Sequence, residues 1–122
     1  VRMASYDKRY AVYTGVLQFL SNILRDVTAE TAHIRDFYQS TGQSVFLFGA
    51  EVSEYLQEIR DKFIELKKIK HRLDSKKAPG GEPLTTGAYK EWEDKEAAVV
   101  QWLSEQYDRA PRVFQRYLQV KL

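Results

Sequence analysis

The sequence contains no cysteine, which excludes disulfides and thiolate metal sites. It has no apolar run that approaches the ~18 residues a membrane-spanning helix needs. The net charge of +2 is too small to direct the whole molecule toward nucleic acid or a membrane. With 43% hydrophobic and 30% charged residues, the composition is typical of one globular domain, which we expect to span positions 1–122.

Residue patterns that identify a reaction are also missing. There is no serine in a Gly-x-Ser-x-Gly setting, and the glycine-rich segment 78–83 lacks the Gly-Lys-Ser/Thr ending of a phosphate-binding loop. Glu30 and His33 have the Glu-x-x-His spacing of di-iron helical bundles, but the position three before His71 is Lys68 rather than Glu. We therefore predict no catalytic, cofactor-binding or metal-ligating residues and no enzyme activity.

Helical periodicity is abundant, above all over residues 5–25. Ser5 is a candidate N-cap, and Asp7 suits the first turn of such a helix. At about 100° per residue, the apolar side chains fall on two adjacent stripes. One stripe holds Tyr6, Tyr10, Tyr13, Leu17, Leu20 and Leu24, and the other holds Val12, Val16, Phe19 and Ile23. About half of the circumference is therefore predicted to be buried, as in a helix packed between two others.

Three further helices are predicted. A short one covers about 29–39, the longest covers about 50–73, and another covers about 88–110. Two of the three prolines and three of the six glycines fall within 74–87, which predicts an exposed, mobile loop. The fold class that follows is an all-α, single-domain bundle of about four helices, mostly antiparallel.

Two segments leave alternatives open. The apolar run 45–48 is too short for a regular helix, so we expect a buried extended link or a single turn at one end of the bundle. Pro111 cannot continue a helix without losing a hydrogen bond. The chain either bends there or begins a terminal helix that buries Phe114, Tyr117 and Leu118.

The two longest predicted helices have distinct faces. Helix 50–73 has a seam with a repeat of about 3.5 residues, formed by Val52, Tyr55, Leu56, Ile59, Phe63, Leu66 and Leu73. One flank is acidic, with Glu51, Glu54, Glu58, Asp61 and Glu65. The inward residues of helix 88–110 are expected to be Trp92, Val99, Leu103, Tyr107 and Ala110. Ile64 points away from the seam and could support self-association.

Charged residues suggest one local site. Arg9 lies between the two apolar stripes, so we expect its charge to reach solvent or to form a salt bridge. A basic cluster ends the longest helix: Lys67, Lys68, Lys70, His71, Arg72, Lys76 and Lys77. These cations could simply offset the helix dipole, or they could bind an anionic partner such as a membrane surface. Nucleic acid is less favoured, because the loop offers no aromatic side chain for base stacking.

The chain resembles a family of small bacterial proteins of uncharacterised function. The resemblance is carried by Tyr6–Tyr13, Phe19–Leu20, Phe46–Gly49, Glu54–Leu56, Trp102 and Tyr117–Leu118. In that family a D-K-R-[FY]-x-V-[FY] motif follows an N-terminal transmembrane helix, and an F-L-F element precedes a long helix. The resemblance implies a membrane anchor before Val1 and carries no established activity.

We accordingly predict a non-enzymatic interaction or scaffold domain. The expected location is the cytoplasm, at the inner face of the plasma membrane, through an anchor that lies outside these 122 residues. The alternative is a nucleic-acid-binding or regulatory module that uses Lys67–Lys77. Expected partners are an unidentified protein, a second copy of the chain or an anionic membrane surface, with nucleic acid less favoured. No cofactor is expected.

Overall fold

A computed structural model of the protein describes residues 2–25, 35, 37–39, 42 and 44–118. Its helices are α1 (Arg2–Arg25), α3 (Ser44–Leu47), α4 (Ala50–Ser75) and α5 (Thr86–Leu118). Across these described ranges there is no β-strand. The predicted all-α helical bundle is therefore confirmed.

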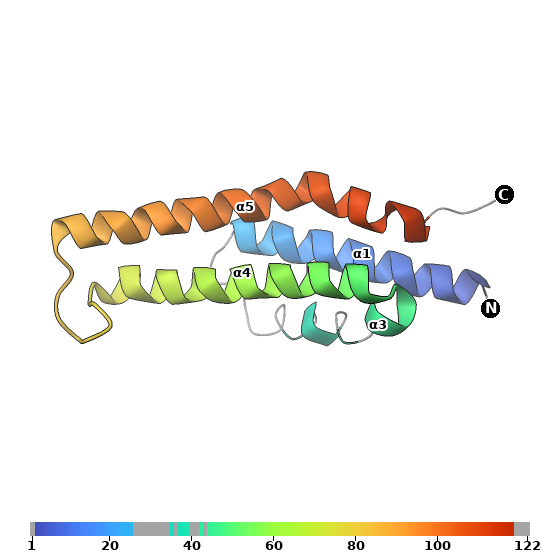
Figure 1. The fold of residues 1–122 in the computed structure, drawn as a ribbon, viewed down its shortest axis with the longest axis horizontal. Helices are drawn as coiled ribbons and strands as arrows, with labels where there is room; N and C mark the ends of the chain where they lie inside the picture. The colour runs from blue at the N-terminus through green and yellow to red at the C-terminus, as the bar shows by residue number, and fades with distance from the viewer. Residues whose placement is uncertain (1, 26–34, 36, 40–41, 43, 119–122) are drawn as a thin grey trace.

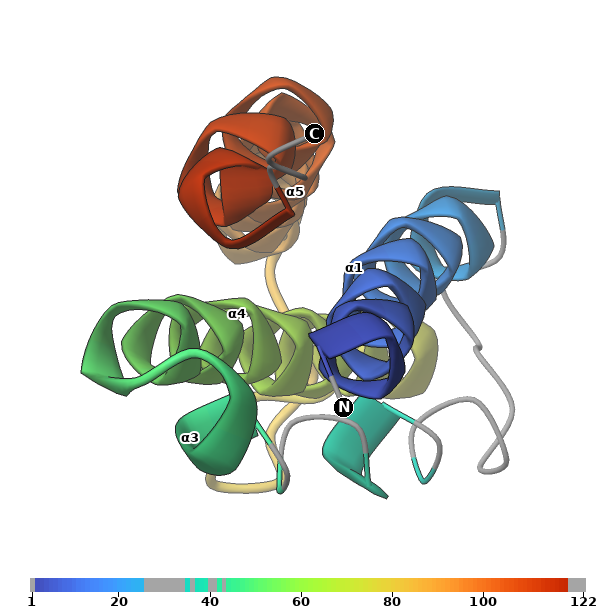
Figure 2. The same ribbon diagram turned by 90° about the vertical axis from the view of Figure 1, so that its right-hand side faces the viewer.

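The three long helices form a triangular bundle that is seen end-on in Figure 2. α5 contacts both α1 and α4 and runs antiparallel to each of them (Figure 1). α1 and α4 run in the same direction, because α4 begins at the end of the bundle where α1 begins (Figure 1). The predicted antiparallel packing thus describes the two contacts of α5 but not the relation between α1 and α4.

Several helix boundaries differ from the predictions. α1 begins at Arg2, so Ser5 lies inside the helix and Asp7 lies beyond the first turn, which holds no acidic residue. Of the predicted short helix 29–39, residues 29–34 and 36 lie outside the described residues, while Arg35 and 37–39 are helical.

The apolar run 45–48 contains the end of one helical turn, α3, rather than an extended link. Its burial is uneven, because Phe48 is buried whereas Phe46 is 89% exposed. The single turn, one of the two predicted outcomes, is therefore observed, and it directs Phe48 but not Phe46 into the core.

Only one of the two apolar stripes on α1 faces the core squarely. The whole stripe of Val12, Val16, Phe19 and Ile23 is buried. From the stripe that contains the tyrosines, only Leu20 is fully buried. Tyr13, Leu17 and Leu24 pack partly buried against this core, and Tyr10 is 49% exposed. The tyrosine stripe therefore lies along the edge of the interface and not at its centre.

The predicted seam of α4 is confirmed, since all seven of its residues are buried. The prediction omitted Ile69, which is also buried. Leu66, Ile69 and Leu73 follow the three-and-four spacing of a helix that packs along its length against an antiparallel neighbour. Ile64, predicted to point away from the seam, is 37% exposed.

α5 continues through Pro111, and its axis bends in the C-terminal third (Figure 1). The bend was one of the two predicted outcomes, and Phe114 beyond it is fully buried. Tyr107 was expected to point inward but is 38% exposed, and Gln106 is buried in its place. The 3.5-residue repeat accounts for this, because the position that follows Leu103 by three residues continues the seam.

The contact between α4 and α5 is fixed in register by polar pairs. Arg116 forms an ion pair with Glu51 at 3.0 Å, and Arg109 forms one with Glu58 at 3.3 Å. The two acids and the two arginines are each seven residues apart, as expected for antiparallel helices with a heptad repeat. Part of the acidic flank of α4 therefore forms ion pairs with α5.

One buried hydrogen bond joins the same two helices. The Tyr55 hydroxyl donates to Gln106 Oε1 at 2.9 Å, and Gln106 Nε2 donates to the Trp102 carbonyl at 2.8 Å. Burial raises the pKa of the Tyr55 phenol well above its usual value, and the guanidinium of Arg109 over the ring opposes this shift only in part. The neutral phenol is therefore the form that fits the core.

Aromatic side chains fill the space between the helices. Phe19 of α1 stacks on Phe37 with ring centroids 4.1 Å apart, and it meets Phe63 of α4 edge-on at 5.2 Å. Near the start of α1, the Phe114 ring contacts Phe48 at 5.2 Å and Tyr13 at 5.3 Å. These contacts join segments that are far apart in the sequence into one core.

Arg9 links three helices at this end. Its Nε donates to the Leu47 carbonyl at 2.8 Å, where α3 ends, and its Nη1 donates to the Tyr117 carbonyl at 3.4 Å, near the end of α5. Among the described residues it forms no ion pair, so the predicted salt bridge is not observed there. A guanidinium suits this place because carbonyl groups at helix C-termini lack intrahelical partners.

Candidate functional site

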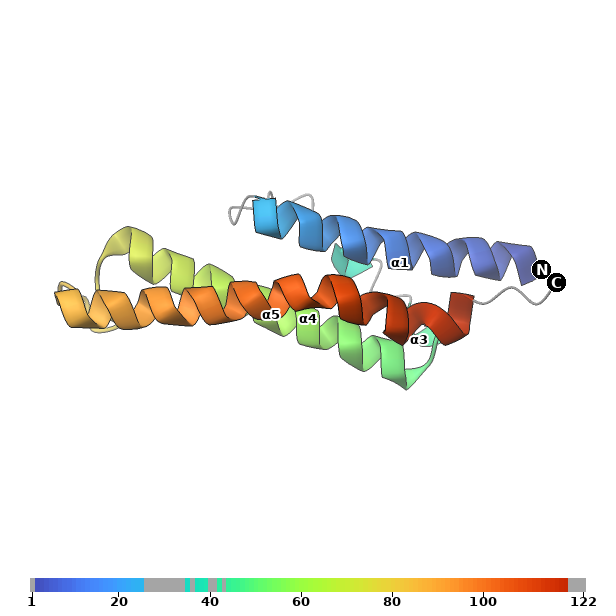
Figure 3. The same ribbon diagram turned by 90° about the horizontal axis from the view of Figure 1, so that it is seen from above.

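The predicted basic cluster lies at the far end of the molecule from the start of α1. α4 and α5 extend beyond the end of α1 there and form a helical hairpin (Figure 3). The structure brings all seven cluster residues into this tip: Lys67, Lys68, Lys70, His71, Arg72, Lys76 and Lys77. Lys70 and Arg72 are half-buried, and the other five are exposed. Charged groups of one sign are thus concentrated where only two helices pack.

The end of α4 positions one of these lysines, Lys76. Lys76 adopts a left-handed conformation with φ 58°, and its N–H donates to the Arg72 carbonyl at 2.9 Å. This is the usual way to end an α-helix, although glycine is the residue most often found there. The Lys76 carbonyl then accepts a hydrogen bond from the Leu84 N–H at 2.9 Å. Lys76 is therefore held beside Arg72.

The loop between α4 and α5 has internal hydrogen bonds. The Ala78 N–H donates to the Glu82 carbonyl at 2.7 Å, and the Gly81 N–H donates to the Ala78 carbonyl at 2.9 Å. Gly81 has φ 88°, a backbone conformation that residues other than glycine rarely adopt. Lys77 and Pro83 form an isolated antiparallel bridge. The sequence predicted an exposed loop correctly, but it gave no sign of this small closed turn.

Four of the cluster residues enclose a hollow on the surface of α4. Lys67, Lys68, His71 and Arg72 line a depression of about 540 Å³. These positions follow one another at one and three residues, so they share one side of the helix. No ion pair joins any of them to a carboxylate within the described ranges. The hollow therefore offers several cations that are free to bind an anion.

The same tip also carries acidic residues on the facing helix. Glu91, Glu93 and Asp94 are exposed near the start of α5. The dipole of α5 does not account for these acids, because they lie beyond its first turn, which holds no acidic residue. The hairpin tip thus has a basic side on α4, whereas the acids on α5 lie between two exposed lysines, Lys90 and Lys95.

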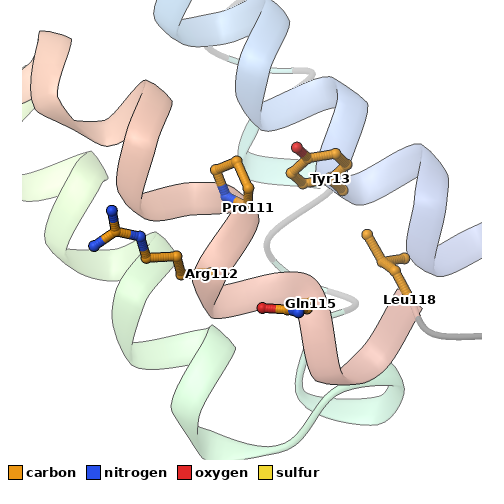
Figure 4. Close-up of a pocket in the computed structure, with 5 residues that line it drawn as sticks. All are labelled: Tyr13, Pro111, Arg112, Gln115 and Leu118. Carbon is orange, nitrogen blue, oxygen red and sulfur yellow. The ribbon is translucent and has the colours of Figure 1, made fainter.

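A second hollow lies near the other end, between α1 and α5. Tyr13, Pro111, Arg112, Gln115 and Leu118 line this groove of about 340 Å³ (Figure 4). Figure 4 shows Tyr13 and Leu118 approaching each other from α1 and α5, whereas Arg112 points away. This groove could not be predicted from the sequence, because Pro111 indicates a bend but not which residues the bend exposes.

Glu96 was also missed. It occupies a seam position of α5 between Trp92 and Val99, and its Oε2 atom is buried with no hydrogen-bond partner among the described residues. Its spacing from Val99 and Leu103 could have indicated it, since seam positions repeat at three and four residues. One acid on a half-buried side chain is not in itself a site.

The side chains that line the hollow on α4 offer positive charge to an anion. Over the described part of the chain, no three His, Asp or Glu side chains gather where they could hold a metal ion. Glu30 and His33 lie outside the described residues. His71 is exposed, and the other residues that line its hollow are Lys67, Lys68 and Arg72.

Comparison with known proteins gives no relative from which to transfer a function. No protein-family model, curated protein or solved structure matches this chain. Within the residues that the structure describes, no helix combines the length and the apolar character needed to cross a bilayer.

Proposed function

We propose that this chain is a non-enzymatic interaction domain whose basic tip binds an anionic partner. The observation that carries the proposal is the hollow lined by Lys67, Lys68, His71 and Arg72, where cations lie together without a described carboxylate to neutralise them. Helices that pack through apolar seams hold this surface in place. Binding through it would depend on charge and therefore on salt concentration.

The direction of the helices bears on the expected membrane anchor. α1 and α4 start at the same end and run the same way, and α4 is 26 residues long (Figure 1). At 1.5 Å per residue this places the basic tip roughly 40 Å from the start of α1. An anchor preceding α1 would therefore hold the tip away from its own membrane. This geometry favours an acidic partner other than that lipid surface.

The test compares three anionic probes with one matched pair of variants. Binding of the chain to phosphatidylserine vesicles, to duplex DNA and to polyglutamate is measured while the salt concentration is raised. The tip variant combines Lys67→Gln, Lys68→Gln and Lys76→Gln. The control variant combines Lys8→Gln, Arg35→Gln and Arg112→Gln, which are exposed and lie outside the hairpin tip. Both variants lose the same net charge.

We expect polyglutamate to bind in a salt-sensitive manner, and we expect only the tip variant to lose this binding. Equal losses in both variants would mean that net charge alone attracts the probe, and the proposal would then be wrong. Selective, salt-sensitive binding to DNA would instead support the alternative of a nucleic-acid-binding module. Binding only to vesicles would support a membrane surface.

A further inference from the structure

The outer side of α1 carries an unusual row of residues. Its members, here called the outer row, are Asp7, Ala11, Thr14, Gln18, Ser21 and Arg25. All six are exposed. They are spaced by four and three residues in alternation, so they form one straight stripe along the helix, as the contact positions of a coiled coil do. This stripe is separate from the residues of α1 that are buried in the core.

The middle of this stripe has no charge. The fifteen residues from Tyr10 to Leu24 include no Asp, Glu, Lys or Arg, although charged residues make up 30% of the chain. The exposed sides of α4 and α5 over a similar length are rich in them. Loss of charge at the centre distinguishes interface cores from ordinary surfaces. Tyr10, which is 49% exposed, borders the row and adds apolar area.

The ends of the row carry opposite charges. Asp7 is at one end and Arg25 at the other. No ion pair joins either of them to another described residue. Asp7 lies beyond the first turn of α1, so the helix dipole does not explain its place. The row is therefore a neutral stripe with an acid and a base about 27 Å apart along the helix.

This order of residues is self-complementary in one orientation. If a second α1 lies antiparallel to the first, Asp7 faces Arg25 of the second copy, and the reverse pair forms at the other end. In the same register Ala11 faces Ser21 of the second copy, and Thr14 faces Gln18. The small side chains of Ala11, Thr14 and Ser21 would let two helices approach closely. In a parallel pair, Asp7 would face Asp7 and Arg25 would face Arg25.

We propose that two copies of this chain associate through the outer rows of their α1 helices, packed antiparallel about a twofold axis. A second copy fits better than a lipid surface, because an antiparallel copy pairs both the acid and the base at the ends of the stripe, whereas an anionic lipid surface would repel the acid. This contact goes beyond the proposed anion binding, since it uses another helix and another face of the molecule. The two proposals can fail independently.

Charge exchange tests the pairing. The molecular mass of the chain is measured by sedimentation as a function of concentration. Asp7→Arg and Arg25→Asp should each weaken dimerisation by roughly tenfold or more, because each turns two attractive contacts into repulsive ones. The double variant should recover the dimer, and so should an equal mixture of the two single variants. A parallel pair predicts no loss in either single variant.

Disulfide trapping gives a second readout, which the absence of cysteine in the natural sequence makes clean. An oxidised mixture of Ala11→Cys and Ser21→Cys chains should form a covalent heterodimer. Each variant alone should not, because its two copies of the new cysteine would lie about 15 Å apart along the helices, beyond the reach of a disulfide. Covalent homodimers of either single variant would overturn the antiparallel register.

A matched pair of variants places the contact. Ala11→Glu puts a charge inside the outer row, and Ala97→Glu puts the same charge on the exposed side of α5. We expect only Ala11→Glu to abolish the dimer, with both variants retaining the helical content of the natural chain by circular dichroism. A natural chain that stays monomeric at millimolar concentration, or a dimer that both substitutions leave intact, would show the proposal to be wrong.

Discussion

The two ends of the molecule differ in what they are made of. Where α1 begins, three helices and α3 meet, and the rings of Phe48 and Phe114 and the guanidinium of Arg9 lie between them. At the other end, of the helices that the structure describes, only α4 and α5 pack together (Figure 3), and their outer surfaces are charged. Burial of aromatic area stabilises the first end, whereas the second needs only a narrow apolar seam. The thin end is thereby free to carry the basic tip.

The largest effect on stability is expected from Phe114, in the core at the end of the molecule where α1 begins. Phe114→Ala removes a fully buried ring that contacts Phe48 and Tyr13, so it should lower the free energy of unfolding by about 3–5 kcal/mol. Phe46→Ala is the control, because this ring is 89% exposed and should cost less than about 0.5 kcal/mol. Urea denaturation measures both. Similar losses in the two variants would contradict the difference in packing.

A smaller loss is expected at the buried hydrogen bond between α4 and α5. Gln106→Leu leaves the buried hydroxyl of Tyr55 without its acceptor and should cost about 1–3 kcal/mol. Adding Tyr55→Phe removes the unpaired hydroxyl, so the double variant should recover part of that loss. A double-mutant cycle by urea denaturation gives the coupling between the residues. Strictly additive losses would mean that the hydrogen bond contributes nothing specific.

The same tyrosine predicts a dependence on pH. Because burial raises the pKa of Tyr55 in the folded state, its contribution is complete below the unfolded value of about 10 and is lost as the pH rises above that value. The slope due to this one group approaches about 1.4 kcal/mol per pH unit. Thermal unfolding from pH 8 to 11 should show a steeper decline for the natural chain than for Tyr55→Phe. Parallel curves would contradict the raised pKa.

Arg9 should have an effect of about 1–2 kcal/mol. Arg9→Met keeps the aliphatic stem but loses the hydrogen bonds to the Leu47 and Tyr117 carbonyls. Hydrogen exchange should then increase at the ends of α3 and α5 and stay unchanged at the far tip. Lys8→Met is the control, because Lys8 is the exposed neighbour of Arg9 on α1 and forms no such hydrogen bond with a described residue. Uniform loss of protection throughout the molecule would speak against a local link.

The smallest effect on stability is expected at the basic tip. Lys67→Gln together with Lys68→Gln should change the free energy of unfolding by less than about 0.5 kcal/mol, because both side chains are exposed. A small gain would also fit, since the substitutions relieve repulsion between neighbouring cations. Chemical denaturation at low and high salt measures this. A large loss would mean that the lysines hold the fold rather than a partner.

The sequence predicted most of the fold because helical seams are visible as spacing. The whole predicted seam of α4 is buried, and Val99, Leu103 and Ala110 are buried on α5. The prediction for Tyr107 and Gln106 was wrong, because the more hydrophobic side chain was expected in the core even though the 3.5-residue repeat places Gln106 there. A buried glutamine is acceptable only when its amide finds partners, and the partner hydroxyl lies on another helix.

The candidate site was predicted in composition but not in position. The basic cluster is visible in the sequence, and all seven of its residues lie at one tip of the molecule. Their distance from the start of α1 depends on the direction of α4, which no local pattern encodes. The groove at Tyr13 and Pro111 was invisible for the same reason, since its walls come from two helices far apart in the chain.

The order of residues alone determined that this chain forms helices, where their apolar seams lie and where basic side chains gather, because these properties depend on neighbours within one or two turns. Only the tertiary structure decided that α1 and α4 run in the same direction, that Arg9 meets two carbonyl groups and that most of the tyrosine stripe of α1 stays at the edge of the interface. Those outcomes depend on which helices share a core. That choice is made by packing over the whole molecule.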